Sequence, residues 1–587
     1  MTLLTFKLDL CERSRHRIRV ELEIPLEGWP CDDDAARELF LPSWTPGSYL
    51  VRDYARHIET FTIRDADLEI DVPWRKSAKN RFLITAPESC RRLAISYSVY
   101  CRELSVRTAD VTAEHAYWNG ACLFVWPVGL ENTTARIEVS LPTGWQMQTS
   151  LPIAHEDDLL VLEATGLDEL VDSPCLAGTL DVQAFTACGR QHLFAFDGLA
   201  GLPVPTDLVP QTQRIIEEAV SIFGDPPPYD DYRFLSLFAD VGRGGLEHLS
   251  SSTLLAPRTT FARQRDRENF MGLVAHEFFH VWNGKRMRPA ELWDIDYERE
   301  NYTPLLWVVE GWTAYYDDLL CLRAGVLDSQ RYLAIVAENI TNLQRFPGRL
   351  THSIAEASFD AWIKLYRPDE NSRNSSHSYY TSGALAAMCL DLLIRARTQG
   401  QQSLDDAIAH LFRETYGKSR GYTEEDVVAC LSRAADEDLS TTVNELVHGP
   451  FDPNFEARFA DVGLRLIGTA SEAPFLGLQI KDRMKVSSVL RDSPAALAGL
   501  SPDDELMGIA GLRVTSANWK KILEHAWQPD RPLTFLVSRR GCLTELEIVP
   551  VAHPHVQYRI ELAKDAPPSS QQLGRAWLSL PDDPEKL

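Results

Sequence analysis

One stretch of this 587-residue chain decides the fold around it, and it reads Glu268-Asn269-Phe270-Met271-Gly272-Leu273-Val274-Ala275-His276-Glu277-Phe278-Phe279-His280. Its apolar residues recur at helical spacing, so the stretch predicts a helix. Residues four apart share one helix face, so His276 and His280 can bind one metal ion. Glu277 projects beside that ion and is placed to accept a proton from a water molecule that the metal activates. The pattern indicates a zinc-peptidase centre, and the alternative is a buried amphipathic helix that carries two histidines by chance.

A catalytic zinc ion needs a third protein ligand, because it normally keeps three and leaves the fourth position for water or substrate. Residues 305–316 form an apolar and aromatic run whose one carboxylate is Glu310. A buried carboxylate is costly unless a partner such as a metal compensates it. The next histidine after His280 is His352, so Glu310 is the better candidate; the alternative is a salt-bridged core glutamate. Two imidazoles and one carboxylate suit a single Zn²⁺ ion.

The motifs at residues 276–283, 286–289 and 310–312 resemble those of the glycyl aminopeptidase family. Its members are gluzincin zinc metallopeptidases with a thermolysin-like catalytic domain and an attached PDZ domain. The interval from His280 to Glu310 is longer than in alanyl aminopeptidases, which favours the glycyl branch. The resemblance implies a preference for small N-terminal residues such as Gly or Ala.

The resemblance extends upstream to residues 244–248, Gly-Gly-Leu-Glu-His, which are similar to the exopeptidase motif of zinc aminopeptidases. It implies that Glu247 binds the α-amine of the substrate. Gly244 and Gly245 allow the substrate backbone to approach closely, since neither carries a side chain.

It also extends downstream to residues 378–383, which are similar to the segment that supplies a transition-state tyrosine. Counting back from Gly383 gives Tyr380, and the adjacent Tyr379 is the alternative. Ser382 stands where many relatives have lysine. A phenol near the metal donates a hydrogen bond to the developing oxyanion.

The chain is expected to be a multidomain α+β protein. Residues 1–198 alternate between apolar and polar side chains, which predicts an antiparallel β-sandwich-like domain. Residues 41–54, which include a Pro46-Gly47 turn signal, are typical of the family's N-terminal domain, and we expect them to pack near the active site. Residues 199–455 are expected to form the thermolysin-like domain, with helices near 210–224, 384–395, 404–416 and 423–434. A Thr-x-x-Asp capping signal at Thr423 and Asp426 marks the start of the last of these helices.

Residues 456–555 resemble a bacterial PDZ domain, most clearly in Ser-Pro-Ala-Ala-Leu-Ala-Gly-Leu at 493–500. The expected peptide groove includes the loop Phe475, Leu476, Gly477 and Leu478. PDZ domains bind the carboxyl terminus of an extended peptide, so the groove either selects substrates or braces the catalytic domain. Residues 556–587 form the C-terminal tail, and its part from Asp565 on, which is rich in Pro, Ser, Asp and Glu, is expected to be loosely ordered.

Composition narrows the class of partner. The formal net charge of -25 argues against a nucleic-acid surface, which needs clustered basic residues. Eleven cysteines without a Cys-x-x-Cys pair suit reduced thiols. The N-terminus does not resemble a signal peptide, and apolar runs are too short to cross a membrane, so a cytoplasmic location is expected.

Together these features predict a zinc aminopeptidase that acts on peptides with a free N-terminus. One alternative is a PDZ-guided endopeptidase using the same zinc, which would also cleave N-blocked peptides. The other is a catalytically silent scaffold whose functional part is the PDZ groove.

Overall fold

The computed structural model describes residues 3–31, 36–156, 159–224 and 226–580, and the chain forms two compact units. The first unit extends to residue 301 and includes two short later segments, 324–326 and 419–421. The second unit contains the remaining residues after 301. The chain is a multidomain α+β protein, and each unit is described by itself.

The first unit begins with a β-rich domain of three sheets. Their strand orders are β13-β14-β11-β1-β2-β7-β4, β10-β3-β6-β5 and β12-β15-β9-β8. The strands are Leu4–Asp9 (β1), Arg17–Pro25 (β2), Ala36–Phe40 (β3), Ile58–Asp65 (β4), Trp74–Ala78 (β5), Arg81–Thr85 (β6), Arg92–Tyr100 (β7), Ala109–Val111 (β8), His115–Trp118 (β9), Trp126–Pro127 (β10), Ala135–Ser140 (β11), Gln146–Gln148 (β12), Ile153–Glu156 (β13), Leu159–Ala164 (β14) and Cys175–Gly178 (β15).

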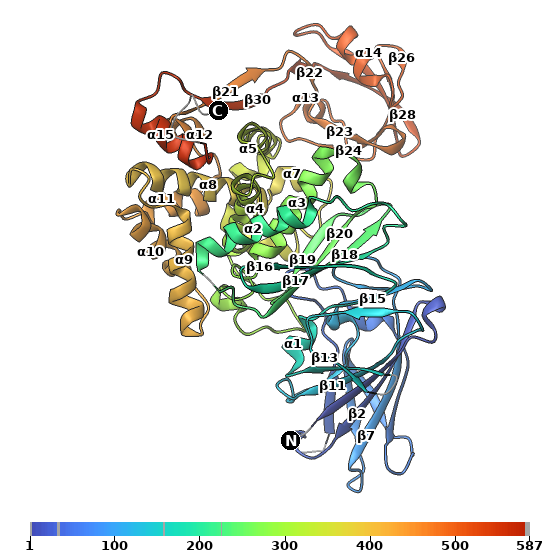
Figure 1. Cartoon of the computed structure of the whole chain (residues 1–587). Helices are drawn as coiled ribbons and strands as arrows, with labels where there is room; N and C mark the ends of the chain where they lie inside the picture. Colours follow the sequence, from blue (N-terminus) through green and yellow to red (C-terminus); the bar gives the residue numbers. More distant parts are fainter. Residues whose placement is uncertain (1–2, 32–35, 157–158, 225, 581–587) are drawn as a thin grey trace. The chain divides into compact units, whose positions relative to one another are not determined.

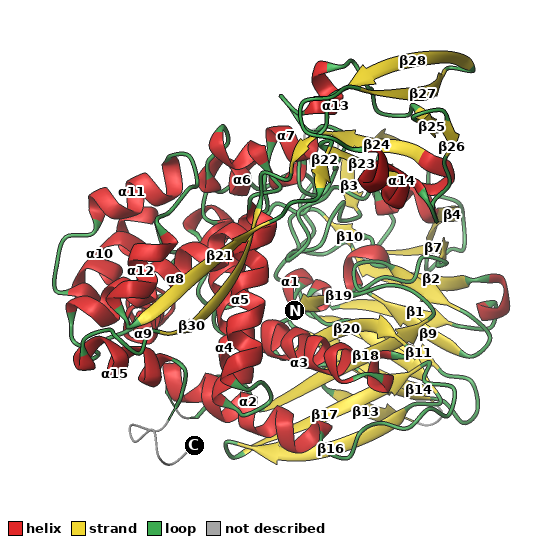
Figure 2. Ribbon diagram, turned by 90° about the horizontal axis from the view of Figure 1, so that it is seen from above, coloured by secondary structure: helices red, strands yellow, loops and turns green. Residues whose placement is uncertain are grey.

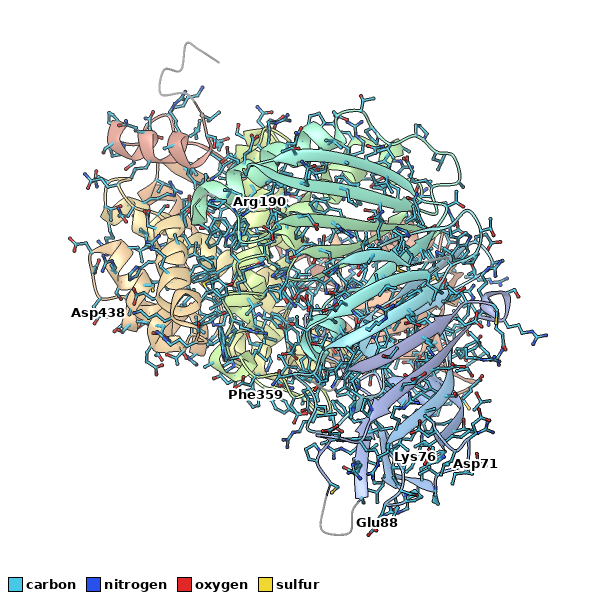
Figure 3. The ribbon with its side chains drawn as sticks, turned by 60° about the horizontal axis from the view of Figure 1, so that its bottom comes forward. Asp71, Lys76, Glu88, Arg190, Phe359 and Asp438 are labelled. Carbon is cyan, nitrogen blue, oxygen red and sulfur yellow. The ribbon has the colours of Figure 1, made fainter. Side chains whose placement is uncertain are left out.

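Alternation along these strands places apolar side chains inside and charged ones in solvent. In β2, Ile18 and Val20 are fully buried, whereas Arg19 between them is exposed. Figure 3 labels Asp71, Lys76 and Glu88, which are exposed. The prediction of a β-rich N-terminal domain is confirmed, with one correction. β1 pairs with β11 in parallel, so the large sheet is not purely antiparallel.

A five-stranded sheet follows, in the order β16-β17-β18-β20-β19. Its strands are Asp181–Ala187 (β16), Arg190–Asp197 (β17), Asp231–Ala239 (β18), Gly244–Glu247 (β19) and Ser251–Pro257 (β20). Helices Leu208–Phe223 (α2) and Gln264–Phe279 (α3) pack on this sheet (Figure 1). The strands β16 and β17 lie before residue 199, so this sheet starts earlier than the expected domain boundary. β19 is the edge strand of the sheet.

The β-rich domain is joined to the five-stranded sheet by specific polar contacts. The Tyr117 hydroxyl lies 3.1 Å from Thr253 Oγ1. The His115 ring lies between Asp110, at 2.9 Å, and Asp197, at 2.6 Å. Burial lowers the pKa of His115, but the two carboxylates outweigh it and raise the pKa to about 9. His115 is therefore a cation at neutral pH, paired with one carboxylate of the β-rich domain, Asp110, and one of the five-stranded sheet, Asp197.

The second unit is mainly helical before residue 462. Its helices are Thr313–Arg323 (α4), Ser329–Leu343 (α5), Ile354–Phe359 (α6), Ser372–Ser375 (α7), Tyr379–Arg397 (α8), Leu404–Thr415 (α9), Glu424–Ala435 (α10), Ser440–His448 (α11) and Phe455–Asp461 (α12), with a π-helical turn at Trp307–Trp312 (η6). The expected cap of α10 is present, because Thr423 and Asp426 form a capping box.

The C-terminal part of this unit contains a six-stranded sheet with two short helices. The paired strands Leu464–Ala470 (β21) and Val556–Leu562 (β30) form a ribbon beside α5 (Figure 2). Between them lie Pro474–Phe475 (β22), Leu478–Lys481 (β23), Lys485–Val489 (β24), Pro494–Leu497 (α13), Glu505–Ile509 (β25), Leu512–Arg513 (β26), Trp519–Ala526 (α14), Leu533–Arg539 (β27), Cys542–Ile548 (β28) and Val551–Ala552 (β29). The identity of this part as a PDZ domain stays a prediction.

The expectation of a loosely ordered tail is wrong for the described part of it. After Asp565, residues Pro568–Trp577 form a helix, α15. Trp577 is almost fully buried, and its indole N–H donates to the Tyr315 hydroxyl at 2.9 Å. The buried indole explains the order, since it compensates for the polar composition around it. Residues 581–587 lie outside the described structure.

Two expectations about environment can be compared with the structure. Among the described residues, we find no helix that combines the length and the apolarity needed to cross a bilayer. All eleven cysteines, each within the described ranges, are free thiols.

Candidate active site

The two histidines predicted to bind the metal, His276 and His280, lie at the C-terminal end of α3 in the first unit. His280 caps the helix with helical backbone angles, and its N–H lies 3.3 Å from the His276 carbonyl oxygen. The two ring centroids are therefore only 4.8 Å apart. The C-terminal end of a helix carries partial negative charge, which favours a bound cation.

The protonation of His280 is determined by the turn after the helix. Its Nδ1 lies 2.7 Å from the carbonyl oxygen of Asn283. A carbonyl only accepts hydrogen bonds, so Nδ1 carries a proton, and Nε2 is the ring nitrogen left to bind a metal. Metal-binding histidines are held in this way by a second partner, so the donor set fits a zinc ion. Sequence reasoning missed Asn283, because its carbonyl is placed by a turn and not by its side chain.

Glu247 and Glu277 lie close together in the first unit. One ligand-type atom from each of Glu247, Glu277 and His280 lies within 4.8 Å of the other two. Both carboxylates are at least 95% buried. A Cβ on Gly245 would overlap the Glu277 carboxylate, so a larger residue at this point of β19 would displace that side chain. The structure thus brings together the predicted amine anchor, the predicted base and one predicted metal ligand.

The Pro46-Gly47 turn of the β-rich domain covers Glu247. Ser48 donates its N–H to the Thr45 carbonyl at 3.2 Å, which closes the turn, and Gly47 has a φ of +85°. A Cβ on Gly47 would lie 2.5 Å from Glu247 Oε1 and 2.6 Å from Oε2. The sequence predicts no chemical role for this segment; the structure places its glycine against Glu247, the predicted amine anchor.

Asp172 holds the segment that directly follows Glu247. Its carboxylate lies 3.2 Å from His248 Nδ1 and 2.5 Å from Lys285 Nζ, and it accepts the Leu249 N–H at 2.7 Å. Burial raises the pKa of Asp172, but Lys285 and His248 outweigh it, so the pKa is lowered and the carboxylate stays charged. Sequence reasoning missed Asp172, because it lies 76 residues before His248 and carries no local signal.

Glu310 and the tyrosines belong to the second unit. Glu310 is 2% exposed and lies in η6, a π-helical turn of the kind found frequently at functional sites. A Cβ on Gly311 would lie 2.5 Å from the Gly383 Cα, so two glycines let η6 contact α8 directly.

Tyr380 is better placed than Tyr379 to use its hydroxyl. Tyr379 is fully buried, whereas Tyr380 is partly exposed and lies 3.4 Å, oxygen to oxygen, from the Tyr366 hydroxyl. Burial raises the pKa of Tyr380, and the charge of Glu310 raises it further. The phenol therefore remains protonated and can donate a hydrogen bond.

The four predicted groove residues of the C-terminal part line one cavity of about 440 Å³. The cavity is also lined by Trp519 and Leu523 of α14 and by Arg345 and Arg373. Sequence reasoning missed these two arginines, which precede the sheet by more than 100 residues.

Comparison with known proteins gives the family. A model described as the peptidase M61 N-terminal domain matches residues 5–179, and one described as M61 glycyl aminopeptidase matches residues 269–386. The chain is 27% identical to a crystallised aminopeptidase N family protein from Idiomarina loihiensis, with a TM-score of 0.90 over 98% of this chain and 100% of that one.

A curated aminopeptidase N from Caulobacter vibrioides is 25% identical over 276 residues, which cover 45% of this chain and 28% of that protein. This chain thus matches little more than a quarter of the length of that relative. The chain is also similar to an M1 zinc metallopeptidase from Deinococcus radiodurans, with 17% identity and a TM-score of 0.45 over 77% of this chain and 93% of that one. The chain thus carries two domains described by M61 glycyl aminopeptidase models, and it shares the fold of the Idiomarina aminopeptidase N family protein.

Proposed function

We propose that this protein is a zinc-dependent aminopeptidase that removes small N-terminal residues, Gly or Ala, from peptides. The observation that carries the proposal is the grouping of Glu247, Glu277 and His280 within 4.8 Å. In one amino-acid residue the amine nitrogen and the carbonyl carbon are only about 2.5 Å apart. An amine anchor next to the general base therefore selects the first peptide bond.

His276, His280 and Glu310 are the residues that would hold the single Zn²⁺ ion. The fixed tautomer of His280 and the partial negative charge at the end of α3 support this assignment. When bound, zinc supplies Lewis acidity to the scissile carbonyl and to the attacking water.

Residues of the site bind the substrate, transfer the proton and stabilise the oxyanion. Glu247 binds the α-ammonium group, and the edge backbone at Gly244 and Gly245 takes the substrate as an added strand. Glu277 accepts the proton of the attacking water and passes it to the leaving amine. Tyr380 donates its hydrogen bond to the developing oxyanion.

The preference for small residues is supported by the Pro46-Gly47 turn. Its Gly47 lies directly against the Glu247 carboxylate, because a Cβ on Gly47 would lie 2.5 Å from Oε1. Crowding at the amine anchor restricts the room around the first residue of a substrate.

We also propose that residues 474–552 form a PDZ module that takes a peptide carboxyl terminus at Phe475, Leu476, Gly477 and Leu478. The cavity lined by this loop and α14 supports the proposal. The free thiols support a cytoplasmic location for the enzyme.

The test compares Gly-p-nitroanilide and Ala-p-nitroanilide with their N-acetylated forms. We expect cleavage of the free amines only, loss of activity on chelation, recovery with zinc, and loss in Glu277→Gln. Glu268 is a half-buried glutamate on the same helix, so Glu268→Gln is the matched control. Equal cleavage of acetylated substrates would instead identify an endopeptidase. A zinc-free wild type that cleaves neither substrate would favour the silent scaffold.

A further inference from the structure

Opposite charges lie near the two ends of the edge strand β19. Glu247 is its last residue, and Gly244 is its first. At Gly244, the guanidinium atoms Nη1 and Nη2 of Arg107 lie 3.7 and 3.9 Å from the position of an added Cβ. Arg107 belongs to the β-rich domain, in the connection between β7 and β8, and it is half-buried.

The backbone around Arg107 is firmly held. The Tyr54 hydroxyl donates to the Arg107 carbonyl at 2.7 Å, and the Arg107 N–H donates to Ser105 Oγ at 3.2 Å. Next to it, the Val106 side chain packs in one apolar cluster with Leu246 of β19. These contacts place the start of the arginine side chain at a defined point beside β19.

The length of β19 gives the spacing between Gly244, beside which Arg107 lies, and Glu247. A strand rises about 3.3 Å per residue, so the three steps from Gly244 to Glu247 span about 10 Å. An extended peptide reaches about 3.3–3.6 Å per residue, which gives about 7 Å for a dipeptide and about 10 Å for a tripeptide. The spacing of about 10 Å between Gly244 and Glu247 therefore matches the length of an extended tripeptide.

A peptide added to the edge of a sheet lies in the plane of that sheet and meets side chains from both faces. Gly245 and Glu247 face the Glu277 side of β19, whereas Gly244 and Leu246 face the β-rich domain. Arg107 can therefore meet the end of a bound peptide from the second face.

We propose that Arg107 binds the terminal carboxylate of a short peptide whose amine is bound by Glu247. The guanidinium fork matches a carboxylate in shape and charge. The preferred substrates are then peptides of about three residues with a free carboxyl end. This inference rests on the proposed aminopeptidase function and names its substrate class.

The test uses Gly-Ala-Ala and its C-terminal amide, with the purified full chain. We expect wild type to show a kcat/KM about 10-fold or more higher for the acid than for the amide, as for a charge-assisted hydrogen bond. Arg107→Gln should bring this ratio close to one, and Arg107→Lys should restore part of it. Arg243→Gln is the control, because Arg243 is an exposed arginine just before β19 and should keep the wild-type ratio.

A length series from Gly-Ala to Gly-Ala-Ala-Ala-Ala gives a second measurement, with a maximum of kcat/KM expected at the tripeptide. An acid-to-amide ratio near one in wild type would overturn the inference. So would an Arg107→Gln variant that loses acid and amide equally, since that is a purely structural effect. Failure of wild type on all of these peptides and on Gly-p-nitroanilide would instead refute the aminopeptidase function itself.

Discussion

Gly47→Ala tests how the β-rich domain controls the amine anchor. The new Cβ would lie 2.5, 2.6 and 2.7 Å from Oε1, Oε2 and Cδ of Glu247. Non-bonded heavy atoms prefer separations of about 3.5–4.0 Å. Either the Glu247 carboxylate or the turn must therefore move by about 1 Å.

The effect on catalysis follows from the loss of a charged hydrogen bond. Such bonds contribute about 1.5–3 kcal/mol, and every 1.36 kcal/mol is tenfold in rate. We therefore expect kcat/KM for Gly-p-nitroanilide to fall roughly 10- to 150-fold. The substitution also places alanine at φ +85°, which costs about 1–2 kcal/mol of folding free energy.

Gly144→Ala separates these two effects. Gly144 lies in the same β-rich domain with φ +83°, and an added Cβ would meet no atom within 4 Å. It should lower Tm about as much as Gly47→Ala while keeping wild-type kcat/KM. The steric reasoning is refuted if Gly47→Ala stays within twofold of wild type while Glu247→Gln loses its activity.

Three further predictions concern other parts of the chain. Tyr380→Phe should lower kcat about 100-fold with little change in KM, because the Tyr380 hydroxyl donates its hydrogen bond in the transition state. Tyr379→Phe should change kcat far less. Equal losses in the two variants would contradict the assignment of Tyr380 as the donor. Gly311→Ala should lower both Tm and activity, because its Cβ would lie 2.5 Å from the facing backbone of α8, whereas Gly417→Ala, with nothing within 4 Å, should be nearly neutral. The pKa of His115 is raised to about 9, so its charge stabilises the fold below about pH 6.5 and this contribution, at most about 3 kcal/mol, is lost as pH rises through 9. The Tm gap between wild type and His115→Gln should accordingly shrink between pH 6.5 and 9, and a constant gap would contradict the pairing.

The difference between the expected and observed C-terminus shows the limit of composition. Residues from Asp565 on are polar and were expected to be loosely ordered, yet α15 is a helix whose Trp577 is buried. One long-range contact, the hydrogen bond from Trp577 to Tyr315, spans 262 residues. Composition averages over a segment and does not reveal one buried anchor.

The features that depend on neighbours within a few residues were predictable from the amino-acid sequence. Helical periodicity placed His276 and His280 on one face, alternation predicted the N-terminal strands, and a capping signal located the start of α10. Such features follow from the repeat of a helix or a strand, so a short window of residues is sufficient to predict them.

The surroundings of Glu247, in contrast, depend on contacts between residues far apart in the sequence. Gly47, Arg107 and Asp172 come from the β-rich domain, at least 72 residues before the start of the edge strand (244 minus 172), and a turn, a loop and a helix end bring them to it. Their positions depend on how two sheets pack and on which residues fill the space between them. No local pattern carries that information, because contacts between sheets depend on the whole fold.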